Sequence, residues 1–182
     1  MRNYRDIRLR QTPTPSQFNI PTSDQFILLS LSQFALLTMT ATAITQHYQK
    51  VLDLPTQGKS LQRFTHKVQN VVQESGITTG LCTVFIRHTS ASLIIQENAD
   101  PDVLVDLETF LSKVVPEKAY YAHSTEGPDD MPAHIRSVLT SMSETIPVIN
   151  GRLALGTWQG IYLWEHRARG HHREVIVHVV GS

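Results

Sequence analysis

Cysteine is almost absent from the chain, since Cys82 is the only one among 182 residues. One cysteine excludes an intrachain disulfide and a zinc site built from several thiolates, and it fits a reducing compartment. The chain also lacks an excess of charge, because 16 Lys and Arg residues balance 16 Asp and Glu residues. We therefore expect no nucleic-acid binding driven by bulk charge, which needs a surplus of basic side chains. We also expect a cytoplasmic location, which agrees with the single cysteine.

The sequence contains none of the common catalytic signatures: no glycine loop for phosphates or dinucleotides, no nucleophile elbow and no HExxH pair. A convincing membrane span is also missing. Residues 26–44 carry no charge, but they are rich in Ser and Thr, whereas a span needs about 20 predominantly apolar residues. We predict that residues 1–45 form a disordered extension or reflect a start assigned too early, with Met39 as the true start. Export or anchoring by this segment is the alternative.

From residue 46 onward, strand-like and helix-like periodicities alternate without a repeat or a linker, which predicts a single domain over residues 46–182. Strands are expected over residues 47–54, 60–64, 80–88 and 91–97 and in the stretch after residue 145, and helices begin near Thr65, Asp100 and Asp130. We expect each of these three residues to cap its helix and the strands 80–88 and 91–97 to pair. The order of elements favours an α+β fold with a mixed, mainly antiparallel sheet and about three helices.

A first group of polar side chains surrounds the predicted turn that follows residues 80–88. His88 ends that strand, and Thr89 and Ser90 follow it, while Asn98 and Asp100 lie beyond the next strand. A histidine beside hydroxyl groups offers a metal ligand or a base together with donors for a phosphate. The alternative is that Thr89 and Ser90 only form the turn.

A second group occupies residues 123–135. It combines two histidines with three carboxylates: His123, Glu126, Asp129, Asp130 and His134. Imidazole suits zinc and carboxylate suits magnesium, so the group predicts a site for a divalent cation. The alternative is a set of solvated side chains in which Asp130 does no more than cap a helix.

A third group lies on or beside one strand near the C-terminus and contains Trp158, Gln159, Glu165 and Arg167. The period-two pattern places Glu165 and Arg167 on the same, otherwise apolar face. This predicts a charged pair at the edge of the core. It is either a structural ion pair or an anion site, for which the planar guanidinium is well shaped.

Four motifs, taken in order, resemble the YjbQ family, described as secondary thiamine-phosphate synthase enzymes. They are HTSAS, the tetrapeptide Asn98-Ala99-Asp100-Pro101, EGPDDMPAHI and GRLALGTWQGIYLWEHR. The similarity covers residues 46–181. The resemblance implies a curved sheet, a homotrimer and a polar site near the subunit boundaries. It also implies a reaction that joins an aminopyrimidine methyl diphosphate to a thiazole phosphate and releases diphosphate.

The polar residues that match these motifs are carried over from the resemblance, and we hypothesise the following roles for them. The expected catalytic residues are His88, Glu126, Asp129 and Arg167, with Arg167 facing phosphate. The expected substrate-binding residues are Thr89, Ser90, Asn98, Asp100, Trp158, Gln159 and Glu165. The expected ligands of a zinc or magnesium ion are His88, His123 and His134.

The expected partner is a small phosphorylated metabolite, with no membrane involved. Two other functions stay open at this point. One is a metal-dependent hydrolase of a small phosphorylated or amide substrate. The other is a non-catalytic trimer that binds a metabolite or a metal.

Overall fold

The computed structural model describes residues 45–182, and the predicted extension with its alternative start at Met39 lies outside them. The strands are β1 (Gln46–Pro55), β2 (Ser60–Arg63), β3 (Thr79–Ile86), β4 (Ala91–Glu97), β5 (Ser143–Ile149), β6 (Arg152–Leu153), β7 (Gln159–Glu165) and β8 (His172–Gly181). The helices are α2 (Thr65–Ser75), α3 (Pro101–Val114) and α4 (Asp130–Leu139). The predicted α+β fold with three helices is confirmed. None of these helices is long and apolar enough to cross a membrane.

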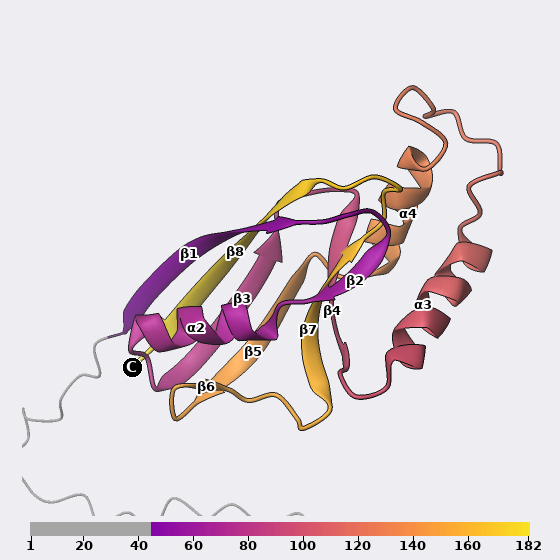
Figure 1. The fold of residues 1–182 in the computed structure, drawn as a ribbon. Coiled ribbons are helices and arrows are strands. Elements are labelled where there is room, and N and C mark those ends of the chain that lie inside the picture. Colours follow the sequence, from indigo (N-terminus) through magenta and orange to yellow (C-terminus); the bar gives the residue numbers. More distant parts are fainter. Residues whose placement is uncertain (1–44) are drawn as a thin grey trace, which may run out of the picture. The chain divides into compact units, whose positions relative to one another are not determined.

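The strands form two antiparallel sheets (Figure 1), one in the order β1-β8-β3-β5-β6 and one in the order β2-β7-β4. The predicted pairing of residues 80–88 with 91–97 is wrong. Both edges of β3 are occupied by β5 and β8, so β4 has no free edge of β3 to join and pairs with β7 instead. The chain crosses from one sheet to the other over residues 87–90.

The main hydrophobic core lies between the two sheets and α2 (Figure 1), and residues from β3, β8 and β7 meet in it. Val84 and Val177 are paired across β3 and β8 and are fully buried, while their sequence neighbours alternate toward solvent. This alternation is the period of an antiparallel sheet with one buried face. The valines of α2 cover the core at helical spacing through Val68, Val71 and Val72.

The helix caps follow the sequence only in part. The Asp100 carboxylate accepts a 2.9 Å hydrogen bond from the Asp102 amide ahead of Pro101, as expected for an N-cap. The expected cap at Thr65 is wrong, because its hydroxyl accepts a hydrogen bond from the Ile161 amide of β7 at 2.8 Å and Phe64 takes the capping position. The Thr65 side chain thus joins α2 to the three-stranded sheet.

Strand β7 is buried on both faces. Ile161 and Leu163 enter the main core, whereas Trp164 on the other face packs with Leu111 of α3 and Val115 in a second apolar cluster. The predicted two faces of this strand are therefore confirmed, and both are covered. Helices α3 and α4 lie on the side of the three-stranded sheet that faces away from α2 (Figure 1).

Candidate metal centre

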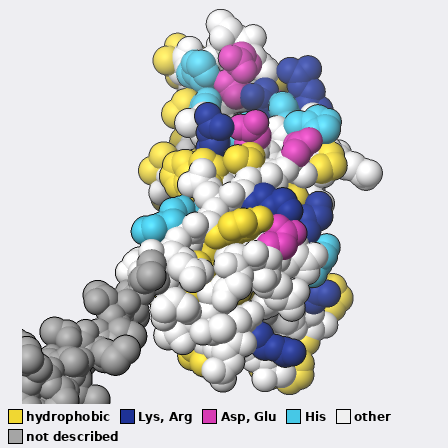
Figure 2. Space-filling view, turned by 90° about the vertical axis from the view of Figure 1, so that its left-hand side faces the viewer, with side chains coloured by type: hydrophobic (Ala, Val, Ile, Leu, Met, Phe, Trp, Pro, Cys, Tyr) yellow, Lys and Arg dark blue, Asp and Glu magenta, His cyan; other side chains and the backbone are white. Residues whose placement is uncertain are grey.

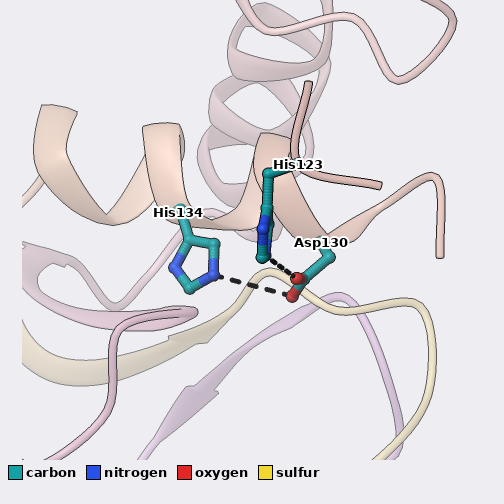
Figure 3. A group of neighbouring side chains, drawn as sticks. All are labelled: His123, Asp130 and His134. Carbon is teal, nitrogen blue, oxygen red and sulfur yellow. Dashed lines mark hydrogen bonds and ion pairs between the residues drawn. The ribbon is translucent and has the colours of Figure 1, made fainter. Parts of the chain in front are cut away.

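Three donor side chains converge where the loop after α3 meets the start of α4 (Figure 3). His123 comes from the loop, Asp130 begins α4, and His134 lies one turn further along the same helix. Nε2 of His123 lies 2.8 Å from Oδ2 of Asp130, and Nε2 of His134 lies 3.7 Å from Oδ1. One donor atom from each of the three residues lies within 4.8 Å of the other two.

The orientation of His134 is fixed by the backbone of a distant turn. Its Nδ1 atom donates a hydrogen bond of 2.9 Å to the carbonyl oxygen of Thr89. A carbonyl only accepts, so Nδ1 carries a proton, and Nε2 is the ring nitrogen that faces Asp130. Metal-bound histidines are commonly held by such a bond from the second ring nitrogen.

Asp130 is held in the buried floor of the site by Arg167. The Arg167 guanidinium bonds to the Asp130 carboxylate, donates from Nε to Asp129 at 3.0 Å, and donates to the Glu126 carbonyl at 2.9 Å. Burial opposes ionisation of Asp129, but the Ala168 amide and Arg167 outweigh it and hold the pKa of that carboxyl below its usual value. The expected role of Arg167 in facing phosphate is not what its geometry shows. Its side chain is only 5% exposed and is bonded to protein groups, so Arg167 positions the two aspartates.

The donor set fits a divalent ion such as zinc, for which two imidazoles and one carboxylate are a common set of three protein ligands. The exposed side-chain fractions are 47% for His123 and 33% for His134, against 2% for Asp130. The site is thus open to solvent on the histidine side and closed on the carboxylate side. An ion held here has room for a water or a substrate oxygen. In Figure 2, histidine, acidic and basic side chains gather at the upper end of the face in view.

The sequence predicted Asp130 either as a member of the cation-binding group or as a helix cap, and the expected ligand set of His88, His123 and His134 did not include it. In the structure Asp129 takes the N-cap position, and Asp130 is the first residue of α4 with its side chain against His123, His134 and Arg167. The signal that was available is the spacing of Asp130 and His134, because residues four apart on a helix lie on one face.

His88 lies outside this group of donors. Its Nε2 atom accepts a hydrogen bond of 2.9 Å from the Glu174 amide at the start of β8. Burial, followed by the nearby positive charge of Arg173, lowers the pKa of its imidazole. His88 therefore joins the five-stranded sheet at a turn instead of completing a three-histidine site.

Glu165 forms a separate buried ion pair. It binds Arg173 by two hydrogen bonds of 2.7 and 2.5 Å, and it accepts a third bond from the Thr56 hydroxyl at 2.8 Å. The expected charged pair of Glu165 with Arg167 is wrong, because only the backbone amide of Arg167 reaches that carboxylate. Burial opposes ionisation of Glu165, but Arg173 and the other donors outweigh it and lower its pKa. Ser90 is the further neighbour of this pair, with its hydroxyl 3.2 Å from Arg173.

The remaining expected substrate residues lie at the opposite end of the three-stranded sheet. Asn98, Trp158 and Gln159 lie where β4 ends and β7 begins, and Asp100 caps α3 beyond them. Six residue steps separate Gln159 from Glu165 along β7, which at about 3.3 Å per residue amounts to about 20 Å. Within one chain, the expected site residues therefore lie at two opposite ends of the three-stranded sheet and do not form a single site.

Comparison with known proteins agrees with the fold and the motifs. Residues 50–182 match the family model described as UPF0047 protein YjbQ-like. A UPF0047 protein of Synechocystis is 65% identical over 144 residues, which cover 79% of this chain and 98% of that protein. The UPF0047 protein YjbQ of Escherichia coli O157:H7 is 41% identical over 136 residues, covering 74% of this chain and 99% of that protein.

Solved structures agree with this result. An uncharacterised protein of the same family from Clostridium acetobutylicum superposes with a TM-score of 0.65 at 39% identity, covering 72% of this chain and 98% of that one. A protein of unknown function from Sulfolobus solfataricus gives a TM-score of 0.68 at 24% identity, covering 75% of this chain and 99% of that one, and so shows the same fold. With the family model matched over most of its length, the chain belongs to the YjbQ-like UPF0047 protein family.

Proposed function

We propose that this protein is a metal-dependent enzyme that joins an aminopyrimidine methyl diphosphate to a thiazole phosphate and releases diphosphate. The observation that carries the metal-dependent part is the convergence of His123, Asp130 and His134, with donor atoms within 4.8 Å of one another at a solvent-open position. The choice of reaction comes from the family resemblance. His123, Asp130 and His134 would hold a divalent ion, which would supply positive charge to stabilise the oxygens of a leaving diphosphate.

The chain's own residues prepare the site for such chemistry. The Thr89 carbonyl fixes the tautomer of His134, and Arg167 fixes the carboxylate of Asp130. Because these groups are held before a ligand arrives, little reorganisation is needed on binding, which favours stabilisation of developing charge. The exposed faces of the two histidines leave the approach to the site free.

We include a homotrimeric assembly and a cytoplasmic location in this proposal. Assembly is supported by α3, where Phe110 and Val114, four residues apart on one helix face, are 65% and 53% exposed although both are large and apolar. Adjacent exposed apolar side chains commonly mark a contact with another protein. Light scattering on the full chain tests this point, because a monomer has one third of the mass of a trimer.

The test of the proposed reaction uses the full chain, both phosphorylated precursors, and product detection by mass spectrometry. We expect thiamine phosphate from the native protein, loss of the product with a chelator, and recovery when zinc is restored. His134→Ala should abolish both the product and the bound metal. The matched control is His172→Ala, which removes an exposed histidine whose ring bonds only to Asp53 among the described residues.

Each other outcome has a defined meaning. Release of inorganic phosphate or diphosphate without a coupled product would replace the synthase with a hydrolase at the same centre. Bound metal without turnover of either kind would favour a binding protein. A coupled product that survives both His134→Ala and the chelator would contradict the proposed centre.

A further inference from the structure

A polar pocket lies beside the first turn of α2, at the end of β7 where Gln159 begins the strand. Its volume is about 380 Å³, which lies within the usual range for small-molecule sites of about 300–1,000 Å³. The side chains that matter for its chemistry are Arg63, His66, Asn98, Leu153, Leu155 and Gln159. The pocket combines basic and amide groups with an apolar wall.

The charge of this pocket is not compensated. No Asp or Glu lines it. Within residues 45–182, no carboxylate comes within ion-pair distance of Arg63, although Arg63 also borders a neighbouring pocket that contains Glu97 and Asp100. The buried arginines of the domain are each paired with a carboxylate: Arg136 with Glu108, Arg167 with Asp129 and Asp130, and Arg173 with Glu165. Arg63, in contrast, is exposed to solvent. Arg63 therefore has a free guanidinium beside a cavity.

The neighbouring groups hold the pocket in shape and leave donors available. Asn98 donates hydrogen bonds to the carbonyls of Thr157 and Gln159, and Oε1 of Gln159 accepts one from the Gly156 amide. The Nε2 donor of Gln159 has no protein acceptor among the described residues. A Cβ atom at Gly160 would lie 3.2 Å from Cδ of Arg63, so the glycine leaves room for the arginine stem.

We propose that this pocket binds a small metabolite in which a phosphoryl group is attached to an apolar or aromatic portion. The guanidinium fork of Arg63 matches phosphate oxygens in two parallel bonds, and His66 and the Gln159 amide supply further donors. Leu153 and Leu155 provide the contact surface for the apolar portion. Gln159 of the pocket lies about 20 Å along β7 from Glu165, which is two residues before the Arg167 that holds Asp130. Because the pocket shares no residue with the metal centre, we expect this binding to require no metal and to be separate from the proposed reaction.

Titration calorimetry on the full chain in the presence of a chelator tests this site, with phenyl phosphate as the probe and phenol as its uncharged counterpart. We expect phenyl phosphate to bind and phenol not to bind. Arg63→Gln should weaken the binding of phenyl phosphate about tenfold or more, because it removes a charge-assisted bond. The matched control is Arg152→Gln, an exposed arginine of β6 that does not line the pocket. It should change the binding by less than about twofold, since an exposed charge outside the pocket is screened by salt.

A second readout places the probe. The ring signals of His66 in nuclear magnetic resonance spectra should move on addition of phenyl phosphate and stay in place with phenol. His134→Ala should leave the binding unchanged. Equal weakening by Arg63→Gln and Arg152→Gln, loss of binding in His134→Ala, equal binding of phenol, or no binding at millimolar probe would each overturn the proposal.

Discussion

Nδ1 of His134 and the carbonyl oxygen of Thr89 are joined by a hydrogen bond of 2.9 Å, although the two residues are 45 positions apart in the chain. This bond connects α4 to the crossover between the two sheets. It also determines which nitrogen of the imidazole is free to bind an ion. The turn at residues 88–90 thus acts on the candidate metal centre through its backbone, whereas the Thr89 side chain is not required for this contact.

Zinc should stabilise the folded protein through this centre. At a free concentration of 100 times the dissociation constant, an ion that binds only the native state adds about 2.7 kcal/mol to the free energy of unfolding. Urea denaturation with and without zinc measures this difference. We expect His134→Ala to lose the stabilisation and His172→Ala to keep it. Equal stabilisation in both variants would place the ion elsewhere.

Replacement of Arg167 should destabilise the fold strongly. Arg167→Met leaves the Asp129 and Asp130 carboxylates buried without their counter-charge, and breaking a buried pair on one side costs about 3–5 kcal/mol. Urea denaturation at pH 7 measures the loss. The control Arg169→Met removes an exposed arginine from the β7–β8 connection and should stay within about 0.5 kcal/mol of the native protein. A loss below about 1 kcal/mol for Arg167→Met would contradict the role given to this side chain.

Stability should fall as the pH decreases below about 6.5. Burial, with the nearby positive charge of Arg136, lowers the pKa of His166 to about 3, against about 6.5 in the unfolded chain. Above pH 6.5 both states are neutral at this residue. Below it the unfolded state takes up a proton that the folded state does not, so up to about 1.4 kcal/mol of stability is lost per pH unit until pH 3.

The variant His166→Gln isolates this effect. A glutamine can still bond to Ser92, whose hydroxyl lies 2.8 Å from Nε2 of His166, but it does not titrate. The free energy of unfolding should therefore depend less steeply on pH in the variant between pH 4.5 and 6.5, measured with a chelator present. Identical slopes in the two proteins would show that His166 does not contribute to the acid sensitivity.

Gly80 should be intolerant of any side chain. A Cβ atom there would lie 2.0 Å from the carbonyl oxygen of Val180 and 2.8 Å from Cα of Gly181, so β3 and β8 would have to separate. We expect Gly80→Ala to lower the thermal midpoint and to cost about 1–3 kcal/mol. Gly156→Ala is the matched control, because its Cβ atom would meet only the Gln159 side chain, at 3.4 Å or beyond. Equal midpoints for the two variants would contradict the close approach of the strands.

Features set by neighbouring residues were predictable from the sequence. The Asp100–Pro101 start of α3 depends on local backbone preferences, which favour an N-cap aspartate followed by proline. The two faces of β7 followed from its alternation. These signals predicted the α+β class, the bounds of the first four strands to within a few residues and the starts of the three helices.

Features that depend on distant partners were not predictable in this way. Thr65 and Asp130 each have the side chain of a helix cap, but their oxygens are used by Ile161 in one case and by His123 and Arg167 in the other. The local pattern does not show the contact of Thr65 with Ile161 or of Asp130 with Arg167, because these partners are 96 and 37 residues away. Strand pairing also depends on residues far apart in the sequence. For this reason the prediction that β3 pairs with β4 was wrong, and β3 pairs with β5 and β8 instead.

The position of β7 between two polar ends has a consequence for how proteins of this family diverge. Each end is built from its own loops: the residues after α3 and β7 at one end, and those before β7 and α2 at the other. The strand between them is buried on both faces and is therefore constrained by packing. Substitutions in the loops at one end are far enough from the other end to leave its packing unchanged. The two ends can therefore evolve at different rates on an unchanged scaffold.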